Sequence, residues 1–164
     1  MVVSETDPRL HIVFVCTGNI CRSPMAEVII HDSVESAGLD DAARITSCGL
    51  GGWHVGQGAD KRAIAELRRG GYDGSSHRAS QLSDEDLDAD LIVALDTGHR
   101  EILRQQAPDP DKVVLLRDFD PDSAPDSSVA DPFYGDEEDF ARTRQAIEAA
   151  ADGLMVWIRD HARD

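Results

Sequence analysis

The stretch LHIVFVCTGNICRSPMAE, residues 10–27, decides the fold of this chain. Its first six residues are rich in Val, Ile and Leu, as is typical of a strand buried on both faces. Gly18 and Asn19 follow, and these residue types tolerate the positive φ angles that a tight loop needs. Ser23 suits the N-cap of a helix, and Pro24 suits its first position. We therefore expect a strand, a tight loop and a helix in direct succession.

The same alternation continues along the chain. Runs rich in Val, Ile and Leu at 44–48, 90–95 and 112–116 predict three further buried strands. Helical spacing predicts four helices. The first stops at Gly38, and the second carries Ala63, Ile64 and Leu67 before Gly70 and Gly71. The third follows Asp96 and includes Ile102 and Leu103. The last begins near Asp136 and places on one face Phe140, Ile147, Leu154 and Trp157 or Ile158. This pattern predicts a three-layer α/β fold, a parallel sheet covered by helices on both faces. Residues 118–134, rich in Pro, Asp and Ser, indicate a functional loop.

Length and composition limit the class of protein. The chain has 164 residues, which predicts one domain, 1–164, in which residues 1–9 form a flexible N-terminal segment. The net charge of −16 argues against nucleic acid as a partner. No apolar run is long enough for a membrane span or a secretory signal, so we expect a cytoplasmic protein with no membrane partner, although export without a signal peptide stays open. The three cysteines, Cys16, Cys21 and Cys48, predict reduced thiols rather than a disulfide framework.

Cys16 and Arg22 lie at the two ends of the loop that follows the first strand. Their separation lets the backbone between them curl into a ring whose N–H groups point inward. Those N–H groups, the positive end of the helix dipole and the Arg22 guanidinium would hold the oxygens of a phosphate. The same positive field stabilises a thiolate, so we expect Cys16 to be a nucleophile held against phosphorus. Ser23 can donate a hydrogen bond to that sulfur.

Two other interpretations of this loop stay open from the residues alone. Cys16 can be a small buried hydrophobic residue, with Gly-Asn as an ordinary turn. Cys16 and Cys21 can also be compared with metal ligands, but no second cysteine pair accompanies them, so no metal site is predicted. Five histidines show no ligand spacing and receive no role: His11, His31, His54, His99 and His161.

The sequence CTGNICRSPMAE, residues 16–27, resembles the phosphate-binding loop of the low molecular weight protein tyrosine phosphatases, and of a bacterial member in particular. Further matches follow in order along almost the whole chain: TSCGLGGWHVG at 46–56, SHRA at 76–79, VALD at 93–96 and DPFYG at 131–135. The resemblance implies a flavodoxin-like sheet of four parallel strands and an enzyme that hydrolyses phosphotyrosine through a phosphocysteine intermediate, without metal or cofactor. It also implies tyrosine-phosphorylated proteins as substrates and inorganic phosphate or other oxyanions as inhibitors.

The resemblance also implies roles for individual residues. By matching position, Cys16 is the nucleophile, Arg22 clamps the phosphate and the transition state, and Asp131 is the general acid. The loop residues that would bind the phosphate are Thr17, Gly18, Asn19, Ile20, Cys21, Arg22 and Ser23. Supporting hydrogen bonds to the loop are implied for Ser47 and His77, with Asn19, Ser23 and the nearby Glu27.

The residues alone do not identify the general acid, because four aspartates precede a proline: Asp7, Asp109, Asp120 and Asp131. Asp131 is favoured because Phe133 and Tyr134 follow at once and offer aromatic walls beside it. Its alternative is a simple turn before the last helix. Trp53 is expected to form the opposite wall of a slot for a phenyl ring, and its alternative is a half-buried core tryptophan. Asp96 could orient Arg22 or cap a helix.

Two loop residues refine the expected function through the resemblance. Ile20 stands where relatives that act on phosphoarginine tend to carry Thr, so its apolar side chain favours tyrosine. Cys21 resembles the family's backup thiol, which traps an oxidised nucleophile as a disulfide and makes the enzyme redox-sensitive. Its alternative is a second structural cysteine. Cys48 is interpreted as a packing residue.

Two other functions compete with the phosphatase. Arsenate resembles phosphate and would enter the same loop, so a thiol-dependent arsenate reductase is one alternative. That chemistry usually needs cysteines beyond the loop, and residues 49–164 contain none. A noncatalytic phosphotyrosine-binding module is the other alternative, and the presence of Cys16, Arg22 and Asp131 together argues against it.

Overall fold

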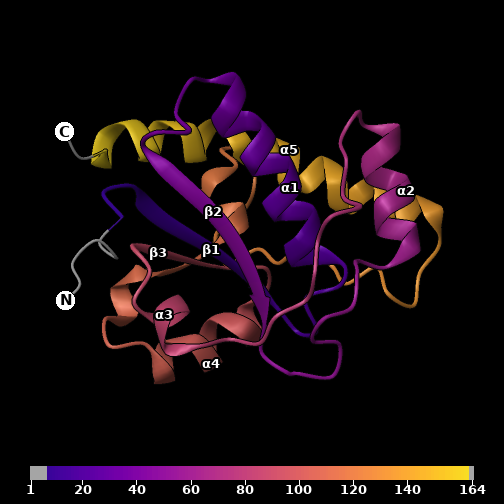
Figure 1. Cartoon of the computed structure of the whole chain (residues 1–164), viewed down its shortest axis with the longest axis horizontal. Helices are drawn as coiled ribbons and strands as arrows, with labels where there is room; N and C mark the ends of the chain where they lie inside the picture. Colours follow the sequence, from indigo (N-terminus) through magenta and orange to yellow (C-terminus); the bar gives the residue numbers. More distant parts are fainter. Residues whose placement is uncertain (1–6, 163–164) are drawn as a thin grey trace.

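The computed structural model describes residues 7–162 (Figure 1). In chain order its elements are β1 (Leu10–Cys16), α1 (Arg22–Ser36), β2 (Ala43–Gly49), α2 (Lys61–Arg69), α3 (Asp84–Leu87), β3 (Leu91–Ala94), α4 (Thr97–Gln106), the 3₁₀ turn η2 (Pro110–Lys112), β4 (Val113–Leu115), the 3₁₀ turn η3 (Leu116–Phe119) and α5 (Glu137–His161). The four strands and four helices predicted from the sequence are all confirmed. The short helix α3 is an addition, formed by a capping box on Ser83 and Asp86.

The strands form one parallel sheet in the order β2-β1-β3-β4. In this order the chain runs outward from β1 to β2 on one side and through β3 to β4 on the other. The loops after β1 and β3 therefore diverge at the carboxyl edge, the position at which open α/β sheets bind ligands. Cys16 ends β1 at this point, and Asp96 follows β3.

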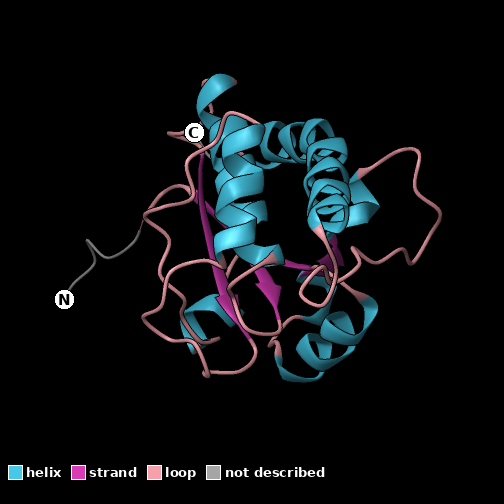
Figure 2. Ribbon diagram, turned by 90° about the vertical axis from the view of Figure 1, so that its right-hand side faces the viewer, coloured by secondary structure: helices cyan, strands magenta, loops and turns pink. Residues whose placement is uncertain are grey.

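Alternate residues of the strands fill two separate cores, as the three-layer prediction requires. Ile12 and Phe14 of β1 belong to the core shared with α1 and α5. Val13 and Val15 belong to the smaller core shared with Leu103 of α4. Figure 2 shows the two helical layers on opposite sides of the strands. All four of these β1 side chains are fully buried, so β1 is the central support of the loop that follows it.

The start of α1 differs from the prediction. The helix begins at Arg22 with Cys21 as its N-cap, so Ser23 and Pro24 are its second and third residues. Ser23 does not cap the helix because its hydroxyl is directed to Cys16 instead. Gly38, at which the helix was predicted to stop, follows the last turn with a φ of 71°, the left-handed conformation that glycine commonly supplies after a helix.

Smaller differences concern exposure. Ile102 is 43% exposed, so Leu103 alone of that pair enters the core. In α5 the buried residue of the expected pair is Ile158, whereas Trp157 stacks on His161. None of the helices in residues 7–162 combines the length and apolar character needed to cross a membrane.

Part of the N-terminal segment is held in place. Arg9 and Arg44 both pair with Asp7, at 2.8 and 3.6 Å. The rest of the segment that we expected to be flexible, residues 1–6, lies outside the described residues.

Candidate functional site

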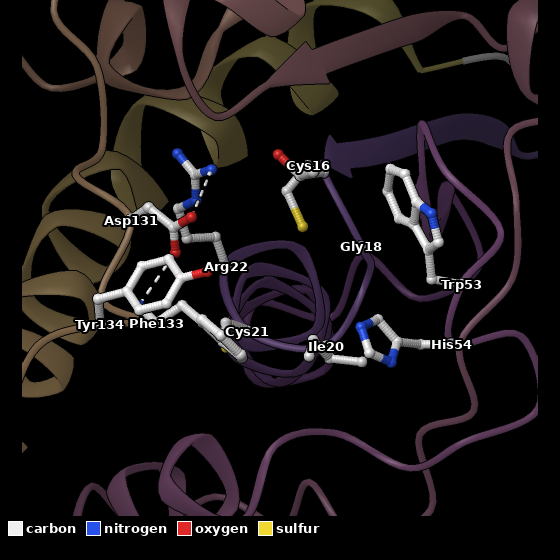
Figure 3. Close-up of a pocket in the computed structure, with 11 residues that line it drawn as sticks. Cys16, Gly18, Ile20, Cys21, Arg22, Trp53, His54, Asp131, Phe133 and Tyr134 are labelled. Atoms are coloured by element: carbon white, nitrogen blue, oxygen red, sulfur yellow. Dashed lines mark hydrogen bonds and ion pairs between the residues drawn. The ribbon is translucent and has the colours of Figure 1, made fainter.

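A cleft of about 240 Å³ opens at the carboxyl edge of the sheet. The sequence predicted a site at the loop after the first strand, and the cleft gathers residues from this β1–α1 loop, the segment after β2 and the loop before α5 (Figure 3). It is lined by Cys16, Thr17, Gly18, Ile20, Cys21, Arg22, Trp53, His54, Asp131, Phe133 and Tyr134. Every predicted catalytic and cleft residue is therefore in or at this cleft.

The β1–α1 loop keeps its own N–H groups free. Its carbonyl groups at Thr17, Asn19 and Ile20 accept hydrogen bonds from Gly51, His77 and Asp60, respectively. By contrast, none of the N–H groups of residues 18–21 donates to a protein acceptor within residues 7–162. A loop whose acceptors are used and whose donors are free is suited to hold an anion.

Asn19 has the left-handed conformation expected of this loop, with a φ of 59°. Gly18 does not, because the positive-φ glycines of the described residues are Gly38, Gly56 and Gly71. A Cβ at Gly18 would lie 3.1 Å from the ring of His54, so a larger residue there would have to displace that ring. The expectation of a positive φ at Gly18 was therefore wrong.

The sulfur of Cys16 has two hydrogen-bond partners in α1. The hydroxyl of Ser23 lies 2.9 Å from Sγ, and the backbone N–H of Ser23 lies 3.4 Å from it. Both groups can donate to a thiolate, and the N-terminus of α1 adds the positive end of the helix dipole. Cys16 is only 3% exposed, yet its sulfur is directed into the cleft (Figure 3).

Arg22 is buried beneath the loop, with an exposure of 4%. Its Nη1 donates to Oδ2 of Asp96 and to the carbonyl of Val129, both at 2.9 Å. Its Nη2 lies 3.6 Å from Oδ2 of Asp131. Because the partners on Nη1 hold the guanidinium plane, Nε and Nη2 remain for an oxyanion in the cleft.

Asp131 comes from the long loop that precedes α5. Its Oδ1 accepts from the N–H of Phe133 at 3.1 Å, a local turn that fixes the carboxyl group. The side chain is 48% exposed and borders the cleft beside Arg22. A carboxyl group that is held but open to solvent can exchange protons with a bound molecule and with water.

Aromatic side chains flank the cleft from two sides. Figure 3 shows Trp53 on one side and Phe133 with Tyr134 on the other. Trp53 is 71% exposed, so the interpretation as a core tryptophan was wrong. Tyr134 is 95% exposed and packs edge-on against Phe133, with ring centroids 4.9 Å apart. Arg62 of α2 covers the Phe133 ring at 5.4 Å.

The residues expected to support the loop form one hydrogen-bonded network. Asn19 Nδ2 donates to Ser23 at 2.8 Å and to Ser47 at 2.9 Å, and Ser47 donates to Glu27. His77 Nε2 lies 2.9 Å from the Asn19 carbonyl, and its side chain is buried. This network connects α1, β2 and the segment after α2 to the loop.

The other two cysteines are free thiols in different surroundings. Cys21 lines the cleft with Cys16, and burial, followed by the negative charge of Asp60, raises the pKa of Cys21 to about 12. Cys48 is fully buried in the smaller core, where burial raises its pKa as well. Both are therefore protonated thiols at neutral pH.

The sequence did not settle the role of Asp96 and indicated none for His99, although both contribute to the site. Asp96 has both of its possible roles, because Oδ1 caps α4 at the His99 N–H while Oδ2 accepts from Arg22. His99 received no role, but its ring lies 2.9 Å from the Thr17 hydroxyl. Only the three-residue spacing from Asp96, which places both in one helical turn, could have indicated it. His54, also without a predicted role, lines the cleft.

Comparison with known proteins gives a consistent result. Residues 11–163 match the sequence family described as low molecular weight phosphotyrosine protein phosphatase. The chain is 50% identical over 154 residues to the low molecular weight protein-tyrosine phosphatase A of Mycobacterium tuberculosis. The aligned region covers 93% of this chain and 93% of that one.

Two solved structures extend the similarity to the fold. YfkJ from Bacillus subtilis superposes with a TM-score of 0.86 at 34% identity, covering 94% of this chain and 98% of that one. The YwlE arginine phosphatase, as a mutant with a phosphorylated active-site serine, superposes with a TM-score of 0.82 at 30% identity, covering 93% and 97%.

Proposed function

The chain belongs to the low molecular weight phosphotyrosine protein phosphatase family, and from this premise we propose that it transfers the phosphate of phosphotyrosine to Cys16 and then to water. The protein is a protein-tyrosine phosphatase, as its relatives are. The single observation that carries the residue assignment is that the N–H groups at 18–21 are free in a loop whose two ends, Cys16 and Arg22, line the same cleft.

In the first step the thiolate of Cys16 attacks phosphorus while the bond to the tyrosyl oxygen breaks. The N–H groups of the loop and the free edge of Arg22 hold the three other phosphate oxygens and stabilise the charge that develops on them. Asp131, in its protonated form, gives its proton to the departing tyrosyl oxygen. Tyrosine leaves, and the phosphate is bonded to sulfur.

In the second step water attacks the phosphorus of the phosphocysteine. The Asp131 carboxylate takes a proton from that water, so the carboxyl group regains the proton that it gave up. The sulfur leaves as a thiolate, stabilised by the Ser23 hydroxyl at 2.9 Å. The phosphorylated active-site serine in the YwlE mutant supports a phosphoenzyme at this position.

The walls of the cleft support an aryl phosphate as substrate. Ile20, Trp53 and Phe133 offer apolar contact to a phenyl ring. YwlE is described as an arginine phosphatase, so the substrate choice needs a direct comparison. We expect phosphotyrosine peptides to be hydrolysed with a higher kcat/KM than phosphoarginine peptides, and the reverse order would assign this chain to phosphoarginine.

Phosphorylated proteins and oxyanions are the partners that we propose. Tyrosine-phosphorylated proteins would present the ring between the aromatic walls, and inorganic phosphate or vanadate would occupy the loop alone as an inhibitor. The three free thiols support a reducing compartment, and we propose the cytoplasm.

The experiment compares hydrolysis of an aryl phosphate in EDTA by the wild-type protein, Cys16→Ser and Cys48→Ala. Cys48→Ala is the matched control, because it removes a buried thiol outside the cleft. We expect wild type and control to be active and Cys16→Ser to be inactive. Full activity of Cys16→Ser would disprove the nucleophile assignment, and activity that EDTA abolishes would disprove the metal-independent mechanism.

A further inference from the structure

His99 connects two parts of the cleft that the mechanism uses separately. It lies in the first turn of α4 and is 5% exposed. Its Nε2 is 2.9 Å from the Thr17 hydroxyl, the side chain that directly follows the nucleophile. On the other edge of the ring, Nδ1 is 3.3 Å from Oδ1 of Asp96, whose Oδ2 accepts from Arg22.

The charges around the ring determine where its proton lies. Asp96, Arg22 and Asp131 are the charged groups that act on His99, and burial, the largest effect, lowers the pKa of His99, so the ring is neutral at pH 7. Within residues 7–162 Nδ1 has no hydrogen bond of normal geometry, yet it faces a carboxylate oxygen. A lone pair at that atom would be repelled by the carboxylate, so the proton lies on Nδ1. Nε2 is then an acceptor, and the Thr17 hydroxyl donates to it.

We propose that His99 is a positioning residue that couples the conformation of the phosphate-binding loop, through Thr17, to the orientation of Arg22, through Asp96. The ring holds the start of the loop against α4 at Thr17. The backbone N–H of the same residue holds Oδ1 of Asp96 at 2.8 Å, so that Oδ2 faces the guanidinium. This inference rests on the proposed roles of the loop and Arg22, and it adds a link between them.

The first test uses a double-mutant cycle of Thr17→Val and His99→Ala, read as the inhibition constant of inorganic phosphate and as kcat/KM for an aryl phosphate. We expect His99→Ala to raise the phosphate inhibition constant and to lower kcat/KM, each by about tenfold. Thr17→Val should have little further effect once the His99 side chain is absent, because the effects of coupled residues are not additive. Additive effects of the two substitutions would overturn the link.

His11→Ala is the matched control for a merely structural loss. His11 lies at the other end of β1 from Cys16 and is also buried, and its Nε2 lies 2.7 Å from the hydroxyl of Thr46 in β2. We expect it to lower the melting temperature without changing the phosphate inhibition constant. If His99→Ala lowers only the melting temperature, as His11→Ala should, the positioning role is disproved.

A second test needs neither activity nor a variant that folds. Nitrogen-15 NMR of the histidine ring distinguishes the two neutral tautomers in the intact protein. We expect the proton of His99 on Nδ1, and a proton on Nε2 would overturn the proposal whether or not the protein is a phosphatase. A wild-type protein that hydrolyses no aryl phosphate would instead disprove the proposed function and leave the tautomer result valid.

Discussion

The hydroxyl of Ser23 has its direction set by the side chain of Asn19. Asn19 Nδ2 donates to Ser23 Oγ at 2.8 Å, so that oxygen accepts there and its proton is available to the Cys16 sulfur at 2.9 Å, with the Cys48 carbonyl farther away at 3.4 Å. Asn19 is itself fully buried, with its Oδ1 accepting from the Ser80 N–H. The proposed nucleophile is therefore positioned through hydrogen bonds between buried side chains.

The acid assignment gives a prediction about leaving groups. Replacing Asp131 with Asn removes the proton donor, and we expect kcat for phenyl phosphate to fall by about 10²-fold. The loss should be smaller for p-nitrophenyl phosphate, because its phenolate leaves without a proton. Asp109→Asn, another exposed Asp before a proline, is the control. Wild-type turnover of phenyl phosphate by Asp131→Asn would refute the assignment.

The expected redox role of Cys21 gives a second prediction. Peroxide converts Cys16 to a sulfenic acid, and attack by the Cys21 sulfur would form a disulfide and release water. After equal exposure to peroxide, we expect dithiothreitol to restore less activity to Cys21→Ser than to wild type. The control Cys48→Ala should recover as wild type does. Equal recovery by Cys21→Ser would remove the role.

The ion pair of Asp96 gives a prediction about stability and pH. Burial by itself would raise the pKa of Asp96. The hydrogen bond from the His99 N–H, the charge that the His99 ring carries once it is protonated at low pH, and the hydrogen bond and charge of Arg22 outweigh burial and lower this pKa from its usual value. A lowered carboxyl pKa in the folded state stabilises the protein above the unfolded value, and this stability is lost as pH falls through the folded value. We expect the stability difference between wild type and Asp96→Asn in urea to be largest at pH 7 and to shrink below about pH 4. An unchanged difference would contradict the ion pair.

Gly153 of α5 packs directly on the backbone of η3. A Cβ at this position would lie 2.3 Å from the carbonyl oxygen of Phe119 in η3. Because Gly153 has no side chain, the helix packs directly on the backbone that leads into the loop carrying Asp131. Helix propensity alone would favour alanine at such a position by about 1 kcal/mol.

We therefore expect Gly153→Ala to destabilise the protein, by about 1–3 kcal/mol, because a backbone oxygen cannot move aside as a side chain can. Gly98→Ala is the control, since its Cβ would meet nothing closer than 3.4 Å and should be neutral or stabilising. Urea unfolding midpoints measure both variants. A gain in stability for Gly153→Ala would show that η3 adjusts freely.

For the molecule as a whole, the parallel sheet and the charge act on the site together. The order β2-β1-β3-β4 brings the loops after β1 and β3 to one edge, where Arg22 and the loop N–H groups form a local positive site. That site lies in a protein with a net charge of −16. Anionic substrates are therefore attracted at short range and repelled at long range.

This opposition predicts a dependence on salt. Raising NaCl from about 10 mM to about 150 mM shortens the Debye length to about 8 Å and screens the long-range repulsion. We expect kcat/KM for a phosphotyrosine peptide with acidic neighbours to rise relative to that for the same peptide with alanine neighbours. A ratio that is constant or falls with salt would show that charges near the cleft dominate instead.

The sequence alone determined the parts of this protein that depend on neighbours along the chain. Hydrophobic periodicity located four strands and four helices, and the short path from Cys16 to Arg22 is enough to place a sulfur and a guanidinium at one loop. The resemblance then placed Asp131, which the residues themselves could not distinguish from three other Asp-Pro pairs.

Only the tertiary structure decided which distant groups meet. It decided between the two roles that the sequence allowed for Ser23, since the hydroxyl lies at the sulfur and does not cap the helix. It also decided between the cleft and the core for Trp53. It also brought His99 to Thr17. Each outcome depends on how helices pack on a twisted sheet, because a hydrogen bond between residues 82 positions apart is set by that packing and leaves no period or spacing in the sequence.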